Sequence, residues 1–231
     1  MSELILVRHG QASFGAQSYD KLSPLGEEQV QLLARHWQEG AEHFDHLYCG
    51  ELQRQRETAE LLRPLVRSGA HAHVHPGLNE YDGDGLMRLY LHHHHDAGEA
   101  VTLPIADRRE FQRLFEAAVA LWVSGRLQTQ DDENFEPWVN FKARVHGTID
   151  ELMARHTGGS RVLVATSGGV IALALQRVLG IPDEQTIATN WLVNNSAVTR
   201  IRYGGGRVSL SQFNSLPHLE GPALRDKITY R

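Results

Sequence analysis

Arg8 and His9 come directly after the apolar run 4–7 and carry the strongest chemical signal in the chain. Such a run is typical of a strand buried on both faces, and ligands of open α/β sheets bind beyond the carboxyl ends of the strands. A guanidinium suits phosphate or carboxylate, and Gly10 lets backbone approach a ligand closely. The pair predicts that a phosphate or carboxylate ligand binds beside His9. The alternative is two polar residues that end a strand in solvent.

Arg54 and Glu80 are further candidates near the ends of predicted strands. Arg54 could aim a second guanidinium over the mouth of the sheet. Arg56 is two positions on, about 200° around a helix, so only one of these two arginines can face the same site. Glu80 offers a carboxyl that can act as a general acid if it keeps its proton. The alternatives are a solvated helix start for Arg54 and a surface position for Glu80.

Ser167 and Gly168 lie between a later apolar strand and an apolar helix, residues 170–179. A helix start presents free backbone N–H groups and a partial positive charge, which together favour an anion. Ser167 is also a residue type preferred as an N-cap, and both roles can hold together.

The elements that must position these residues alternate between strand and helix, which predicts a mostly parallel sheet. Ser23 followed by Pro24 marks the start of the first helix, which should run to about Glu39. We expect an α/β fold of three layers, α/β/α, with helices on both faces of the sheet. The predicted elements after the first strand are helix 24–39, strand 46–49, helix 52–65, strand 71–75, strand 161–165, helix 170–179 and an antiparallel hairpin of 197–203 with 208–213.

Residues 84–156 depart from this alternation and show long amphipathic helical patterns. One apolar stripe runs through 111–122 and another through 141–152, separated by the polar stretch 128–136. We expect a single domain, 1–231, in which 84–156 is a helical insertion over the carboxyl ends of the strands, where it could wall a substrate pocket.

Composition excludes several classes of protein. The 231 residues include 41% hydrophobic and 22% charged residues, as in ordinary globular proteins, and the formal charge of −5 argues against nonspecific nucleic-acid binding. No run is long enough for a membrane span, and no signal peptide is evident. Cys49 is the single cysteine, so no intrachain disulfide can form, and we expect a cytoplasmic protein. The histidines at 71, 73 and 75 and at 92–95 could bind a metal, but no acidic or cysteine ligand cluster accompanies them.

Three ordered motifs resemble the histidine phosphatase superfamily, also called phosphoglycerate mutase-like. Residues 6–10 match its Arg-His-Gly after the first strand, 52–59 its Leu-x-Arg-x-x-x-Thr-Ala pattern, and 78–80 its Leu-x-Glu. The resemblance covers residues 3–213. It departs from the family at Ser167, where the family usually carries a second active-site histidine.

The resemblance implies a phosphomonoester hydrolase that acts on a small phosphorylated metabolite through a phosphohistidine, with no metal or other cofactor. It assigns His9 as the nucleophile and Glu80 as the proton donor. The residues it implies for phosphate binding are Arg8, Arg54, Ser167 and Gly168.

Two other functions stay open at this point, a phosphoglycerate-type phosphomutase and a weakly active or noncatalytic member that binds phosphorylated ligands. The second is motivated by Ser167, because a hydroxyl cannot carry the charge of an imidazole. His218 is a candidate for a compensating imidazole, and a surface position is its alternative.

Overall fold

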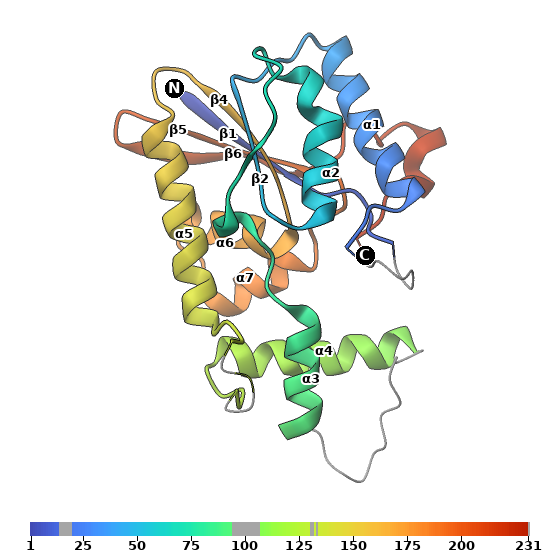
Figure 1. The fold of residues 1–231 in the computed structure, drawn as a ribbon, viewed down its shortest axis with the longest axis vertical. Helices are drawn as coiled ribbons and strands as arrows, with labels where there is room; N and C mark the ends of the chain where they lie inside the picture. Colours follow the sequence, from blue (N-terminus) through green and yellow to red (C-terminus); the bar gives the residue numbers. More distant parts are fainter. Residues whose placement is uncertain (14–19, 94–106, 130–131, 133, 231) are drawn as a thin grey trace. The chain divides into compact units, whose positions relative to one another are not determined.

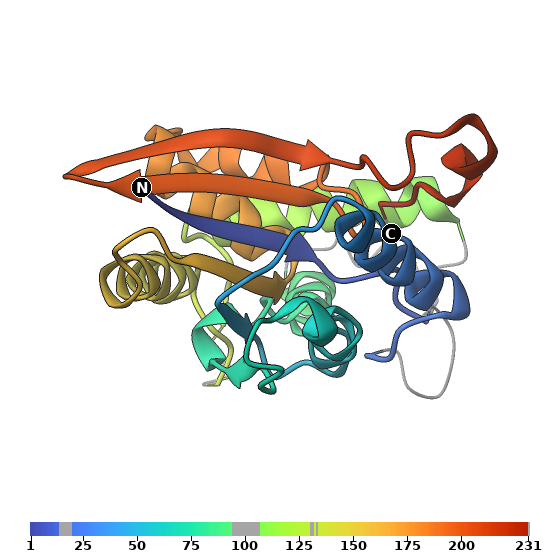
Figure 2. The same ribbon diagram turned by 90° about the horizontal axis from the view of Figure 1, so that it is seen from above.

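The computed structural model describes residues 1–13, 20–93, 107–129, 132 and 134–230, and in this part of the chain a six-stranded mixed sheet is the central element. The strand order is β3-β2-β4-β1-β5-β6 (Figure 2). The first four strands are parallel, whereas β5 is antiparallel to β1 and β6 is antiparallel to β5. The strands are β1 (Ser2–Arg8), β2 (His46–Cys49), β3 (His73–Val74), β4 (Arg161–Thr166), β5 (Val198–Gly204) and β6 (Arg207–Ser215).

Strand β1 lies inside the sheet and is buried on both faces, as its apolar run predicts. Residues 4–7 are all 0% exposed. Alternation along the strand sends Ile5 and Val7 into the core cluster that also contains residues of the first two helices. In the parallel register Arg8 pairs with Thr166, so the carboxyl ends of β1 and β4 meet at one edge of the sheet.

Helices cover both faces of the sheet, which confirms the predicted layers (Figure 1). Helices α1 (Pro24–Glu39) and α2 (Gln53–Leu62) lie on one side, and α6 (Gly168–Leu179) and α7 (Asp183–Asn190) lie on the other. The start of α1 is as predicted, because the Ser23 hydroxyl accepts from Gly26 N–H at 3.0 Å and Pro24 occupies the first turn.

Two predicted elements are shorter in the structure than in the sequence pattern. Helix α2 ends at Leu62 and continues as the 3₁₀ turn η1 (Arg63–Leu65). Pro64 explains the change, because proline lacks the N–H of an α-helical hydrogen bond. The predicted strand 71–75 pairs only at His73–Val74, an exposed pair at the edge of the sheet. The turn η2 (Pro76–Leu78) follows it, and η3 (Pro222–Lys227) follows β6.

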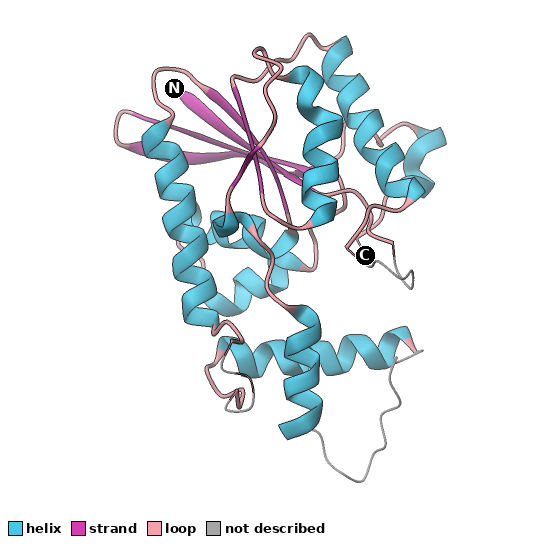
Figure 3. Cartoon of the chain, viewed as in Figure 1, coloured by secondary structure: helices cyan, strands magenta, loops and turns pink. Residues whose placement is uncertain are grey.

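The chain divides into two compact units, Met1–Glu80 with Val145–Arg231, and Tyr81–Arg144. The second unit begins three residues before the predicted insertion 84–156 and ends twelve residues before it does; residues 94–106, 130–131 and 133 are outside the described part. Figure 3 shows helices and loops in its described residues. Its helices are α3 (Gly83–His93), α4 (Arg108–Val123) and the first part of α5 (Trp138–Arg155).

Aromatic packing forms the core of this second unit. The ring of Trp122 lies 4.9 Å from that of Tyr81, 5.1 Å from that of Trp138 and 5.7 Å from that of Phe141, measured between centroids. The predicted apolar stripes on α4 and α5 therefore face inward.

Across the described residues, none of the helices combines the length and the apolar character needed to cross a membrane.

Candidate active site

His9 follows β1 directly and is fixed through both its backbone and its ring. Its N–H donates to Thr166 O at 2.8 Å, and its Nδ1 lies 2.7 Å from Gly10 O. A carbonyl oxygen can only accept, so Nδ1 carries the ring proton and Nε2 keeps its lone pair. Arg54 Nε donates to that Nε2 at 3.2 Å. The ring thus presents an unprotonated nitrogen to a cation, which is the arrangement a nucleophilic imidazole needs.

The environment of His9 keeps its imidazole neutral. Burial lowers the pKa of His9 well below its ordinary value of 6.5, and the positive charges of Arg54 and Arg8 lower it further. The side chain is nearly enclosed, because the residue is 6% exposed. The nucleophilic form is therefore the resting form at neutral pH.

Arg54 lies in the first turn of α2 and is oriented by a carboxylate. Its Nη1 donates to Asp20 Oδ1 at 2.5 Å, while the other Asp20 oxygen accepts from Gln53 N–H at 2.7 Å. Arg56 donates instead to Glu51 O at 2.9 Å and is exposed, which confirms that one of the two arginines faces His9. Asp20 is a site residue that sequence reasoning missed, and no motif or spacing points to it.

Arg8 is held by backbone from two distant parts of the chain. Its Nη1 donates to Val193 O and, at 3.0 Å, to Tyr230 O. Segments far apart in sequence therefore set the position of this guanidinium beside His9.

Glu80 lies at the N-terminus of α6. Its Oε2 accepts from Gly169 N–H at 2.9 Å. The loop that carries it is fixed one turn earlier, where Leu78 O accepts from Thr166 Oγ1 and from Gln55 Nε2, each at 2.9 Å. The carboxyl group thus lies against the free N–H groups of the helix.

Ser167 is fully buried, and its hydroxyl accepts from Gln55 Nε2 at 2.8 Å. It occupies the N-cap position of α6, but its side chain caps no N–H, so the capping alternative is wrong for the hydroxyl. A Cβ on Gly168 would lie 2.4 Å from Asn190 Oδ1, so a larger residue there would require this side-chain oxygen to move. Sequence reasoning missed Gln55, although helical spacing with Ala59 and Leu62 places it on the buried face of α2.

The motifs and the geometry agree with a comparison against protein families. The model of the histidine phosphatase superfamily (branch 1) matches residues 4–102 and 106–216. The chain belongs to this superfamily. An adenosylcobalamin/alpha-ribazole phosphatase from Salmonella typhimurium is 31% identical over 184 residues, which cover 78% of this chain and 80% of the relative.

Solved structures share the fold of this histidine phosphatase superfamily member. A phosphoserine phosphatase from Entamoeba histolytica, in complex with 3-phosphoglyceric acid, aligns with a TM-score of 0.65 at 19% identity over 95% of this chain and all of that one. An alpha-ribazole phosphatase from Shigella flexneri aligns with a TM-score of 0.61 at 23% identity over 92% of this chain and 96% of that one. The fold is therefore the phosphoglycerate mutase-like α/β fold.

His218 is buried rather than exposed, so a surface position is wrong. Its Nε2 lies 2.8 Å from Ser196 Oγ, in the turn before β5. Burial, followed by the charge of His36, lowers the pKa of His218 to about 4. Through this contact His218 binds the turn before β5, whose backbone also holds the carbonyl groups of Arg8 and His9. His218 does not contact the ring of His9 through it.

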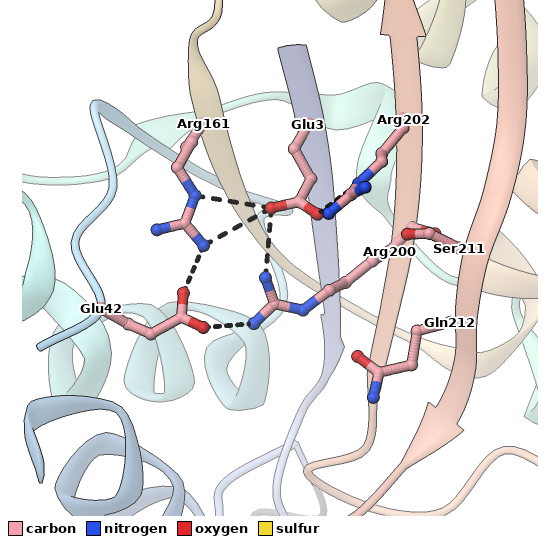
Figure 4. A pocket seen from close by; sticks show the side chains of 7 residues that line it. All are labelled: Glu3, Glu42, Arg161, Arg200, Arg202, Ser211 and Gln212. Atoms are coloured by element: carbon pink, nitrogen blue, oxygen red, sulfur yellow. Dashed lines mark hydrogen bonds and ion pairs between the residues drawn. The ribbon is translucent and has the colours of Figure 1, made fainter. Parts of the chain in front are cut away.

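A separate hollow of about 520 Å³ opens near the other end of β1 (Figure 4). Its charged side chains are paired with one another: Glu3 accepts from Arg200 at 3.1 Å and from Arg161 at 3.4 Å, and Glu42 binds the same two arginines. The charged side chains that line the hollow therefore form an ion-pair network. In the residues the structure describes, no group of three His, Cys, Asp or Glu side chains is placed to hold a metal ion.

Proposed function

We propose that this chain hydrolyses phosphomonoesters of small metabolites through a phosphohistidine at His9. The observation that carries the proposal is the ring of His9, whose Nδ1–H is held by Gly10 O while its Nε2 faces Arg54. That nitrogen is unprotonated, and it can attack phosphorus once the Arg54 Nε–H turns from it to a phosphoryl oxygen.

The reaction runs in two steps. His9 Nε2 attacks phosphorus, the bond to the leaving oxygen breaks, and Glu80 gives that oxygen a proton. Glu80 then takes a proton from water as the water attacks phosphorus and the P–N bond breaks. Arg8, Arg54 and the Gly168 N–H hold the nonbridging oxygens and offset their charge in both steps.

Ser167 stands where the resemblance to the superfamily implies a second histidine, and we propose that it donates a single neutral hydrogen bond to the phosphoryl group. Its oxygen accepts from Gln55, so its own hydrogen is the one left to donate. Loss of one transition-state donor costs about 10²- to 10³-fold in rate, so we expect slow turnover.

The relatives of this chain support small phosphorylated metabolites as its substrates. They include phosphatases for alpha-ribazole and phosphoserine, and one was solved with 3-phosphoglyceric acid. We further propose that residues 84–156 belong to the same domain as a helical insertion.

The experiment compares wild type, His9→Ala and the control His71→Ala with an aryl phosphate and with ³²P-labelled substrate. His71 is an exposed histidine that contacts Glu60, at the far edge of α2. We expect wild type and the control to turn over and to carry an acid-labile label, and His9→Ala to do neither.

Each other result contradicts the hydrolase in a specific way. Equal turnover in all three proteins contradicts His9 as the nucleophile. Label that leaves only to an acceptor alcohol indicates a mutase. Binding of the phosphoester without label or turnover indicates a noncatalytic member, the alternative that the buried Ser167 favours.

A further inference from the structure

The turn before β5 closes over the carbonyl groups of Arg8 and His9. Ser196 N–H lies 3.1 Å from Arg8 O and 3.3 Å from His9 O, and Asn195 Nδ2 donates to His9 O at 3.2 Å. Ser196 has a φ of +57°, a left-handed conformation that non-glycine residues seldom adopt. The turn therefore accepts an unfavourable backbone conformation while it holds the peptide groups of the nucleophile.

Asn195 is buried, 1% exposed, and its amide is fixed in one orientation by Thr229. The Thr229 hydroxyl donates to Asn195 Oδ1 at 3.0 Å, and Asn195 N–H donates to Thr229 O at 2.8 Å. Because Oδ1 is occupied by a donor, the amide nitrogen must face the His9 carbonyl.

Gln29 completes a chain of hydrogen bonds with one direction. Its Nε2 donates to Thr229 Oγ1 at 2.8 Å, and its Oε1 accepts from Gln11 N–H at 2.9 Å. The order of donation is Gln29 to Thr229, Thr229 to Asn195, and Asn195 to His9 O. Tyr230, which follows Thr229 in the sequence, accepts a hydrogen bond from Arg8 through its backbone carbonyl oxygen.

We infer that Asn195 is a positioning residue for the phosphoryl-transfer reaction, acting through the His9 carbonyl, and that Thr229 holds it in its working orientation. The inference rests on the proposed function of His9. Tilting the peptide group after His9 also moves Gly10 O, which holds Nδ1, so the ring turns and Nε2 leaves the line of attack. Misplacement of a reacting atom by about 1 Å can cost on the order of 10²-fold in rate.

The test uses Thr229→Val, which keeps the shape but removes the hydroxyl, and Thr229→Ser, which restores it. Thr186→Val is the matched control, because the buried Thr186 hydroxyl donates to Pro182 O in α7, away from His9. In a single turnover we expect Thr229→Val to form the phosphoenzyme about tenfold more slowly with KM unchanged, by the positioning argument. Thr229→Ser should return to within about twofold of wild type. Asn195→Ala should lose more, about 10²-fold.

The pH profile separates positioning from a general loss of folding. A ring released from its site is less buried, so the pKa of His9 should rise toward its ordinary value. The acid limb of kcat/KM should then move to higher pH in Thr229→Val and not in Thr186→Val. If Thr229→Val matches wild type in rate and in pH profile, as the Thr186→Val control should, Asn195 has no positioning role. If wild type itself forms no phosphohistidine, the proposed function fails first, so the two failures are distinguishable.

Discussion

At the scale of single residues, the site combines positions that local sequence can reveal with positions that it cannot. Arg8 and His9 lie at the end of a strand whose apolar pattern is plain, so the strand-end argument finds their position. Asp20 and Asn195 were not predicted. Asp20 contacts Arg54, and Asn195 contacts His9 O, and each partner is distant in the sequence. The residues next to Asp20 and Asn195 form no motif that predicts these contacts.

The Gln55 and Ser167 pair gives a prediction about the histidine that the resemblance to the superfamily implies at position 167. Both residues are fully buried, so Ser167→His alone should overfill the space and destabilise the protein by about 1–3 kcal/mol. Gln55→Ala in addition makes room for the ring, while Thr166 Oγ1 still satisfies Leu78 O. We expect the double variant to recover stability and to turn over at least about tenfold faster than wild type.

Urea unfolding and steady-state kinetics of the four proteins in this cycle check that expectation. Gln55→Ala alone should be less stable than wild type, because it removes the hydrogen bond that the buried Ser167 hydroxyl accepts and leaves space in the core. A Ser167→His variant as stable as wild type would mean that Gln55 does not fill the imidazole site.

At the scale of elements, the sequence predicts an element best when the residues that determine it lie within that element or next to it. Helix α1 is bounded as predicted because Ser23 directly precedes it and because Pro24 and the apolar spacing lie within it. The hairpin of β5 and β6 is recognised by the glycine run that joins them. The edge strand β3 was overestimated, because its length depends on pairing with β2 and not on its own residues.

The junction between β1 and α1 gives a prediction at this scale. A Cβ on Gly10 would lie 2.2 Å from Gly26 O, a backbone atom in the first turn of α1. Gly10→Ala must therefore push α1 away from the residue after His9. We expect a loss of about 1–3 kcal/mol in the free energy of unfolding, together with a fall in kcat.

Gly147→Ala is the matched control for this change. Gly147 lies in α5 with open space around its Cβ position, and alanine in a helix interior should stabilise by about 0.5–1 kcal/mol. Thermal unfolding of both variants checks the pair. A Gly10→Ala protein as stable as wild type would show that the approach to Gly26 can relax.

At the scale of the whole molecule, the two ends of β1 have different roles. Its carboxyl end carries Arg8 and leads to His9, whereas near its amino end Glu3 joins the ion-pair network with Arg161, Arg200 and Glu42. The network ties β1, β4 and β5 to the segment before β2. It should contribute to stability in a pH-dependent way.

Glu42 provides the test of that dependence. Burial raises its pKa, but hydrogen bonds from Arg161 and Arg200 and their charges outweigh burial, and the net pKa is lowered. A lowered folded pKa gives stability that is present above the unfolded pKa and is lost as pH falls through the folded value. Glu42→Gln should therefore cost about 1 kcal/mol at pH 7, and the difference from wild type should shrink below about pH 4.

Urea unfolding at both pH values measures this difference, with Glu28→Gln as control. Glu28 pairs with Lys227 at 3.0 Å on an exposed surface, so its loss should be smaller, within about 0.5 kcal/mol. A penalty for Glu42→Gln that does not change with pH would contradict an ionic origin.

The central position of β1 also bears on how the molecule is made. Strand β1 precedes both of its partners in the chain, since it pairs on one side with 161–166 and on the other with 198–203. Non-local pairings of this kind form slowly and late. During translation β1 therefore stays unpaired until the residues up to 203 have left the ribosome. A nascent chain shorter than this lacks the surroundings of His9, and its exposed apolar strand is a segment that chaperones would be expected to cover.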